Sequence, residues 1–174
     1  GFKWLHESFG SNWRMTEMQA AIGRIQLKKL HSWRQARKEN AGNIFAVCRE
    51  FQTSLRVPSI PDCIEHAWYK CYVFVRQEGL KPGWDRDRII NEINLLGIPC
   101  FQGSCSEVYL EKAFEGSGYR PKSRLPVAKE LGETSLMFLV HPTLTKKEIK
   151  RTCTGIRQIM TNATSGDKSL VKRP

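Results

Sequence analysis

Hydrophobic residues recur at helical spacing between residues 16 and 50. Met18, Ile22 and Ile25 lie three or four positions apart, with charged residues elsewhere on the same helical wheel. Thr16 and Gln19 match a capping box, in which each residue bonds the other's backbone N–H at a helix start. The pattern predicts a helix from 16 to 50, roughly 50 Å long. A helix of that length is longer than one small hydrophobic core, so we expect it to connect two separate parts of the protein.

Beyond residue 50, strand-like and helix-like patterns alternate. Aromatic and β-branched runs predict strands at 66–76, 98–102 and 135–140. Helical spacing with cap residues predicts helices from Asp85 or Asp87 to Leu96, at 125–131 and from Thr145 to about 160, and 103–124 has the character of a long loop. This order indicates an α+β fold, in which helices cover one face of a small three- to four-stranded sheet.

The two ends differ from this body. Residues 1–15 alternate apolar and polar groups around Gly10 and Ser11, which favours a hairpin or interface segment. Residues 162–174 are polar and basic and are expected to form a disordered tail. We therefore predict four parts: 1–15, a connecting helix at 16–50, a small domain at 51–161, and the tail. Because the chain starts at Gly1 within a patterned stretch, we expect it to be part of a longer protein.

The composition excludes disordered and fibrous classes. Of 174 residues, 40% are hydrophobic and 26% are charged, which is ordinary globular usage. No apolar run is long enough to span a membrane, and no signal peptide is visible. Lys and Arg number 28 against 17 Asp and Glu, giving a net charge of +11. That excess suggests an anionic partner such as nucleic acid or a sugar nucleotide, although basic residues spread over solvated helix faces are the favoured explanation.

Six cysteines show no metal-site spacing. None forms a Cys-x-x-Cys pair, and none has a histidine at zinc-site spacing, so no metal is expected. Buried free thiols in a reducing cytoplasm are favoured over disulfides. Cys105 lies in a Gly-Ser-rich loop where reactivity is conceivable, but a small loop residue is the favoured interpretation.

Candidate chemistry gathers at residues 10–17. A turn containing Ser11 and Asn12, followed by Arg14 and a helix N-terminus, suits an anion, and a capped helix start with a surface arginine explains it equally well. We find no Walker loop, no dinucleotide-binding glycine motif, no nucleophile elbow and no zinc-protease motif.

The stretch Asn12–Gly23, NWRMTEMQAAIG, resembles the NYRMTELQAAIG stretch of the DegT/DnrJ/EryC1/StrS family of sugar-modifying, pyridoxal-phosphate-dependent aminotransferases. Further similar segments follow in the family's order over about residues 9–160; they are His66–Tyr69, Leu96–Pro99, Leu125–Ala128 and His141–Thr145. The resemblance implies the C-terminal portion of a fold-type I transferase. The family's Schiff-base lysine lies in an N-terminal domain whose motifs we do not find, so this chain is expected to hold no catalytic residue and to be inactive alone.

The resemblance also implies roles for individual residues. Asn12 matches an asparagine that reaches the cofactor phosphate of the neighbouring subunit, and Arg14 matches a position near the substrate's phosphates. Where many members have a His-Tyr-Pro segment, this chain has CFQGSCSEVY at 100–109. Gln102, Ser104 and Tyr109 are the candidate replacements for that substrate contact, unless the loop has another shape and makes none.

The resemblance therefore implies part of a homodimeric, cytoplasmic aminotransferase that uses pyridoxal 5'-phosphate. Its substrates would be a nucleotide-linked keto-sugar and an amino-acid donor such as glutamate, with products destined for lipopolysaccharide, other surface glycans or glycosylated antibiotics. Nucleic acid and membrane are not expected partners. Two alternatives stay open: a basic module that binds nucleic acid through the 16–50 helix, and a family member that does not transaminate.

Overall fold

A computed structural model describes residues 8–10 and 14–164. Helix α1 (Glu17–Arg49) begins after a reciprocal capping box: Thr16 N donates to Gln19 Oε1 at 2.8 Å, and Gln19 N donates to Thr16 Oγ1 at 3.3 Å. The helix predicted at 16–50 is thereby confirmed. Most of the expected hairpin at 1–15 and of the expected tail lies outside the described residues.

Within the described residues, four antiparallel strands form one sheet in the order β1-β2-β4-β3. They are β1 (Leu55–Arg56), β2 (Cys71–Val75), β3 (Cys100–Phe101) and β4 (Ser135–Phe138). In the central pair, Cys71 lies opposite Phe138 and Val73 opposite Leu136, so their buried side chains share one face. Alternate residues of β2 are only half-buried, which is the period-two pattern of a sheet covered on one side.

The strands are shorter than the patterns predict, and one strand was missed. The strand expected at 66–76 begins only at Cys71, because Trp68 has a left-handed backbone with φ of 52°. Extended pairing cannot continue through that conformation. Strand β1 has two residues, which is too few for alternation to reveal it.

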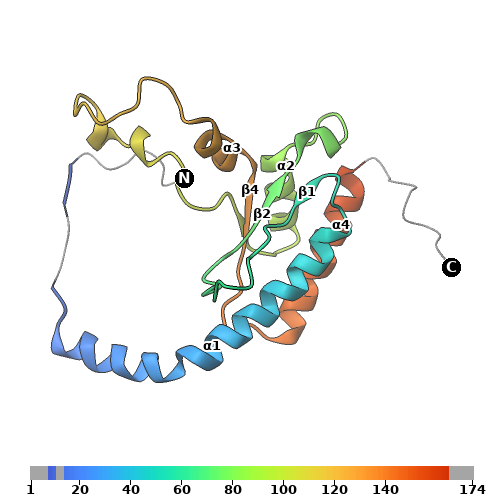
Figure 1. Ribbon diagram of the computed structural model, residues 1–174. Coiled ribbons are helices and arrows are strands. Elements are labelled where there is room, and N and C mark those ends of the chain that lie inside the picture. Colours follow the sequence, from blue (N-terminus) through green and yellow to red (C-terminus); the bar gives the residue numbers. More distant parts are fainter. Residues whose placement is uncertain (1–7, 11–13, 165–174) are drawn as a thin grey trace. The chain divides into compact units, whose positions relative to one another are not determined.

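Three helices contribute to one core against the sheet. They are the C-terminal half of α1, α2 (Arg86–Leu95) and α4 (Lys146–Ala163). Their buried members cluster with the inward side of β2; they include Ile44, Cys48, Ile89, Ile93, Ile156 and Met160. Helix α4 lies beside the C-terminal half of α1 (Figure 1), and Arg157 pairs with Glu50 there at 2.6 Å. The α+β class with helices on one face is confirmed.

The chain divides into two compact units. One contains the sheet and comprises 33–103 and 134–164; the other comprises the described residues up to 32 together with 104–133. In the second unit, the predicted long loop contains short 3-10 turns at Val108–Leu110 and Lys112–Phe114, followed by α3 (Pro126–Thr134), whose last residue falls in the sheet unit. Within the described ranges, no helix combines the length and apolarity needed to cross a membrane.

Candidate functional site

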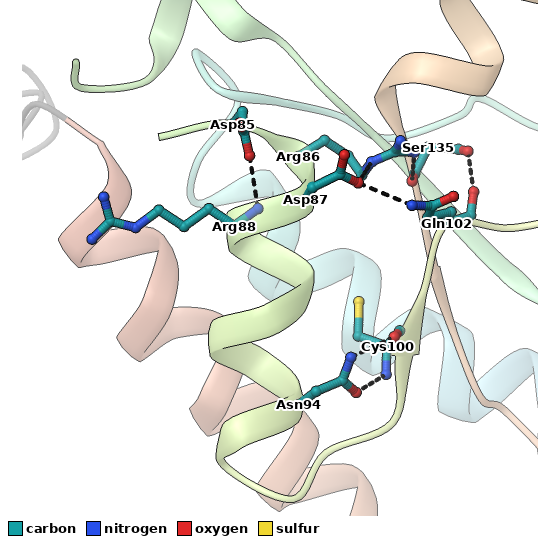
Figure 2. Close-up of polar contacts among 8 residues, drawn as sticks. All are labelled: Asp85, Arg86, Asp87, Arg88, Asn94, Cys100, Gln102 and Ser135. Carbon is teal, nitrogen blue, oxygen red and sulfur yellow. Dashed lines mark hydrogen bonds and ion pairs between the residues drawn. The ribbon is translucent and has the colours of Figure 1, made fainter. Parts of the chain in front are cut away.

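Gln102 follows strand β3 and is held from two sides (Figure 2). Its Nε2 donates to Asp87 Oδ1 at 3.1 Å, and its main-chain oxygen accepts from Ser135 Oγ. Asp87 stands in the first turn of α2, and Ser135 begins β4. The predicted substrate residue Gln102 is therefore fixed between a helix start and the central strand.

A buried guanidinium supports the same cluster. Arg86 Nε donates to Asp87 Oδ1 at 2.7 Å, and its Nη1 donates to the Ser135 carbonyl at 3.2 Å (Figure 2). Only 8% of Arg86 is exposed, and a charge so buried is stable only when it is paired and hydrogen-bonded. Asp87 thus shares one carboxylate oxygen between Arg86 and Gln102, which couples the start of α2 to the sheet.

The turn after β3 is fixed by its neighbours. The Asn94 side chain brackets Cys100, donating to its carbonyl at 2.9 Å and accepting from its N–H at 3.0 Å (Figure 2). Gly103 has φ of 93°, and a Cβ there would lie 2.6 Å from Tyr72 Cε1. Only glycine fits both demands, so the backbone on either side of Gln102 has little freedom.

In the other unit, a carboxylate organises the loop. Glu107 is only 3% exposed and receives both Arg124 Nε, at 2.8 Å, and Arg124 Nη2. Tyr109 Oη donates to Glu107 Oε1 at 2.6 Å and accepts from Leu125 N at 2.9 Å. The bonds from Arg124, helped by the Tyr109 hydroxyl and opposed by burial, lower the pKa of Glu107 to about 2. For Tyr109, burial and then the bond to Glu107 raise the pKa of the phenol.

Arg120 closes the loop from the same side. Its Nε donates to the Tyr109 carbonyl at 3.0 Å, and its Nη2 donates to the carbonyls of Leu110 and Glu111 at 3.1 and 3.2 Å. Sequence reasoning missed Glu107, Arg120 and Arg124, because no local pattern pairs residues 9 to 17 positions apart in a loop. The one signal was the charged residues themselves, within a segment that lacks periodicity.

The structure places the predicted site residues in different surroundings. Asn12 lies outside the described residues. Arg14 and Ser104 are exposed, whereas Tyr109 is half-buried in the Glu107 cluster. Gln102 belongs to the unit with the sheet, and Arg14, Ser104 and Tyr109 belong to the other. Their roles toward a ligand stay predictions.

A pyridoxal-phosphate site needs a lysine for the imine. Every lysine that the structure describes is exposed or half-buried. The buried Arg86 and Glu107 are already engaged internally. In the same described ranges, no group of three or more His, Cys, Asp and Glu side chains is placed to hold a metal ion.

The α+β fold matches that of aminotransferases of known structure. A family model described as the DegT/DnrJ/EryC1/StrS aminotransferase family matches residues 1–157. The chain therefore belongs to that family, as its motif at residues 12–23 predicted.

Three relatives illustrate the similarity. An aminotransferase from Psychrobacter cryohalolentis is 56% identical to this chain, with a TM-score of 0.82. The aligned region covers 93% of this chain and 43% of the aminotransferase. DesV from Streptomyces venezuelae, solved with a ketimine intermediate, is 25% identical with a TM-score of 0.73, covering 91% and 40%. The erythromycin biosynthesis sensory transduction protein EryC1 from Saccharopolyspora erythraea is 29% identical over 149 residues, covering 83% and 37%. The chain thus spans less than half the length of each.

Proposed function

We propose that this chain is the C-terminal part of a pyridoxal-phosphate-dependent aminotransferase that acts on a nucleotide-linked keto-sugar. The observation that carries the proposal is the family match over residues 1–157, together with 56% identity to an aminotransferase. A second similar protein supports the substrate class: the dTDP-3-amino-3,4,6-trideoxy-alpha-D-glucose transaminase of Streptomyces venezuelae is 28% identical over 163 residues. Glutamate is the proposed amino donor, and a bacterial surface glycan such as lipopolysaccharide is the proposed destination.

Within this proposal, the chain binds and orients rather than reacts. The cofactor, when bound, supplies the electron sink for transamination, and a lysine outside this chain holds it. The Asn12 amide would donate to the cofactor phosphate of the partner subunit, and the Arg14 guanidinium would pair with the substrate diphosphate. Gln102, Ser104 and Tyr109 would form the wall on the sugar side.

The first half of α1 supports a homodimer. Met18, Ile22 and Ile25 are 77%, 57% and 54% exposed, although they form the apolar stripe of the helix. Side chains exposed in this way favour burial against another surface. The partner proposed here is a second copy of the protein.

The test is amino transfer by the full-length protein. With pyridoxal phosphate, ¹⁵N-glutamate and UDP- or dTDP-linked keto-sugars, we expect ¹⁵N to appear in the sugar nucleotide by mass spectrometry. Omitting glutamate is the control. A sugar that is dehydrated without gaining nitrogen would instead support a non-transaminating member. Salt-dependent retention on nucleic acid, with no sugar-nucleotide turnover, would support the basic binding module.

A further inference from the structure

A cavity of about 480 Å³ lies between the C-terminal half of α1 and the segment 58–68, all within the sheet unit. We call it the Trp68 pocket. Its volume falls in the range of small-molecule sites. None of its lining residues belongs to the Gln102 or Glu107 clusters, so the proposed function leaves it unexplained.

The helix wall of the pocket combines cations with an aromatic ring. Arg34, Lys38, Phe45 and Arg49 line the pocket, and their spacings of four, seven and four residues put them on one stripe of α1. The Arg49 guanidinium lies 5.8 Å from the centre of the Phe45 ring. One helix face therefore presents three positive charges around the edge of a ring that is itself only 5% exposed.

The opposite wall is built around Trp68 in a conformation that costs energy. Its φ of 52° is rare for a bulky residue, and strain of this kind gathers at functional positions. Trp68 N donates to His66 Nδ1 at 2.9 Å, and the two rings meet edge-on with centroids 4.6 Å apart. The Trp68 ring also lies 5.6 Å from that of Phe45. Because Nδ1 accepts, the His66 proton is on Nε2, where it can donate to a ligand.

The charges of the lining are unevenly paired. Arg34 is neutralised by Glu65, which also lines the pocket. Lys38 and Arg49 form no ion pair with any residue that the structure describes, and Asp62 adds one further carboxylate. Three cations against two carboxylates leave one net positive charge in the lining. Cations suit a phosphate, aromatic rings stack on a base, and a carboxylate accepts from sugar hydroxyls.

We propose that the Trp68 pocket binds a nucleoside phosphate. The base packs against Trp68, the phosphate pairs with Lys38, and a ribose hydroxyl donates to Asp62. The site is a binding site without chemistry of its own, and it does not depend on the proposed transamination.

The test is calorimetric titration of the full-length protein with UMP and with AMP, since stacking on aromatic rings is tolerant of the base. We expect saturable binding that Lys38→Glu weakens at least about tenfold, because a charge-assisted contact is lost. Lys28→Glu is the matched control, since Lys28 is exposed on the same helix and does not line the pocket. Uridine alone and inorganic phosphate alone should each bind at least about tenfold more weakly than UMP, because each supplies only one half of the contacts. Arg14→Ala separates this site from the proposed substrate site and should leave nucleotide binding at the pocket unchanged.

Four results would overturn the proposal. They are an absence of saturable binding of both nucleotides, equal losses in the Lys38 and Lys28 variants, phosphate binding as tightly as UMP, and binding lost in Arg14→Ala but retained in Lys38→Glu. If circular dichroism shows that Lys38→Glu does not fold, Lys38→Gln removes the same charge with a smaller change. Trp68→Leu tests the ring wall independently: UMP should no longer quench the fluorescence that it quenches in the wild type.

Discussion

Individual side chains in this protein are specified by burial and by partners far along the chain. All six cysteines are free, and Cys48, Cys71 and Cys100 are buried. The expectation of buried free thiols is confirmed for these three. Cys105 and Cys153 are half-buried, and Cys63 is exposed.

The thiols should therefore react in a definite order. Burial raises the pKa of Cys48 and of Cys100 to about 12 and raises the pKa of Cys71 further. Because the thiolate is the nucleophile, we expect iodoacetamide at pH 8 to label Cys63 first and the three buried thiols only in denaturant. Peptide mass spectrometry measures this. Native labelling of Cys71 as fast as Cys63 would contradict the burial.

The Glu107 carboxylate should make the protein sensitive to acid. Its pKa, about 2 in the folded state, lies below the ordinary value near 4.3. Its contribution to the free energy of unfolding is complete above the ordinary pKa and is lost as the pH falls from there toward 2. We expect Glu107→Gln to have a lower melting temperature than the wild type at pH 7 and a smaller further decrease between pH 5 and pH 3.

Glu133 provides the comparison for that experiment. It lies 3.4 Å from Arg124 but is half-exposed, so its pairing contributes little. Melting curves of Glu133→Gln should therefore keep the wild-type pH dependence. If this variant changed that dependence as much as Glu107→Gln does, the special role of the buried carboxylate would be refuted.

At the scale of elements, α4 packs closely because one of its positions has no side chain. A Cβ on Gly155 would lie 2.3 Å from Ile98 Cδ1 and 3.3 Å from Leu96 Cδ1. Ile98 is buried, so it cannot turn away freely. The α4 helix therefore approaches the turn between α2 and β3 more closely than an alanine would allow.

Gly155→Ala should lower the free energy of unfolding by about 1 kcal/mol or more, because crowding of about 1–3 kcal/mol outweighs the helix preference of alanine. Gly42→Ala is the matched control, since Gly42 is helical and nothing lies within 4 Å of its Cβ position. We expect it to raise stability by up to about 1 kcal/mol. Urea denaturation measures both, and a stabilising Gly155→Ala would show that the contact relaxes freely.

At the scale of the whole molecule, the exposed apolar stripe of α1 should govern association. If the proposed homodimer uses this stripe, Ile22→Glu combined with Ile25→Glu should shift the full-length protein toward monomer. Analytical ultracentrifugation measures the change. Arg24→Glu changes charge on the same turn without removing an apolar contact and should associate like the wild type. Unchanged association in the double variant would place the interface elsewhere.

The proposed substrate contact can be tested in the same full-length protein. Arg14→Ala should raise KM for the sugar nucleotide about tenfold or more, because a charge-assisted contact to a diphosphate is lost. The KM for the amino donor should stay nearly unchanged. Steady-state kinetics with each substrate varied in turn separates the two, and an effect confined to the donor would refute the assignment.

Elements with strong local signals were predictable to within a few residues. The capping pair Thr16 and Gln19 defined the start of α1, and Thr145 with Glu148 did the same for α4. Capping hydrogen bonds join residues only three apart, so they leave a recognisable pattern in the sequence. Strand β1 could not be found in this way, because a two-residue strand exists only through its pairing with β2.

The sequence by itself determined the α+β class, the long helix and the family motif at residues 12–23, because each depends on spacing between near neighbours. Only the tertiary structure decided how Asp87 holds Gln102, how Arg124 neutralises Glu107 and how Trp68 comes to face Phe45. Those contacts join residues 15 to 23 positions apart. Their energy comes from burial and charge pairing that exist only after the chain has closed its loops, and no local pattern encodes them.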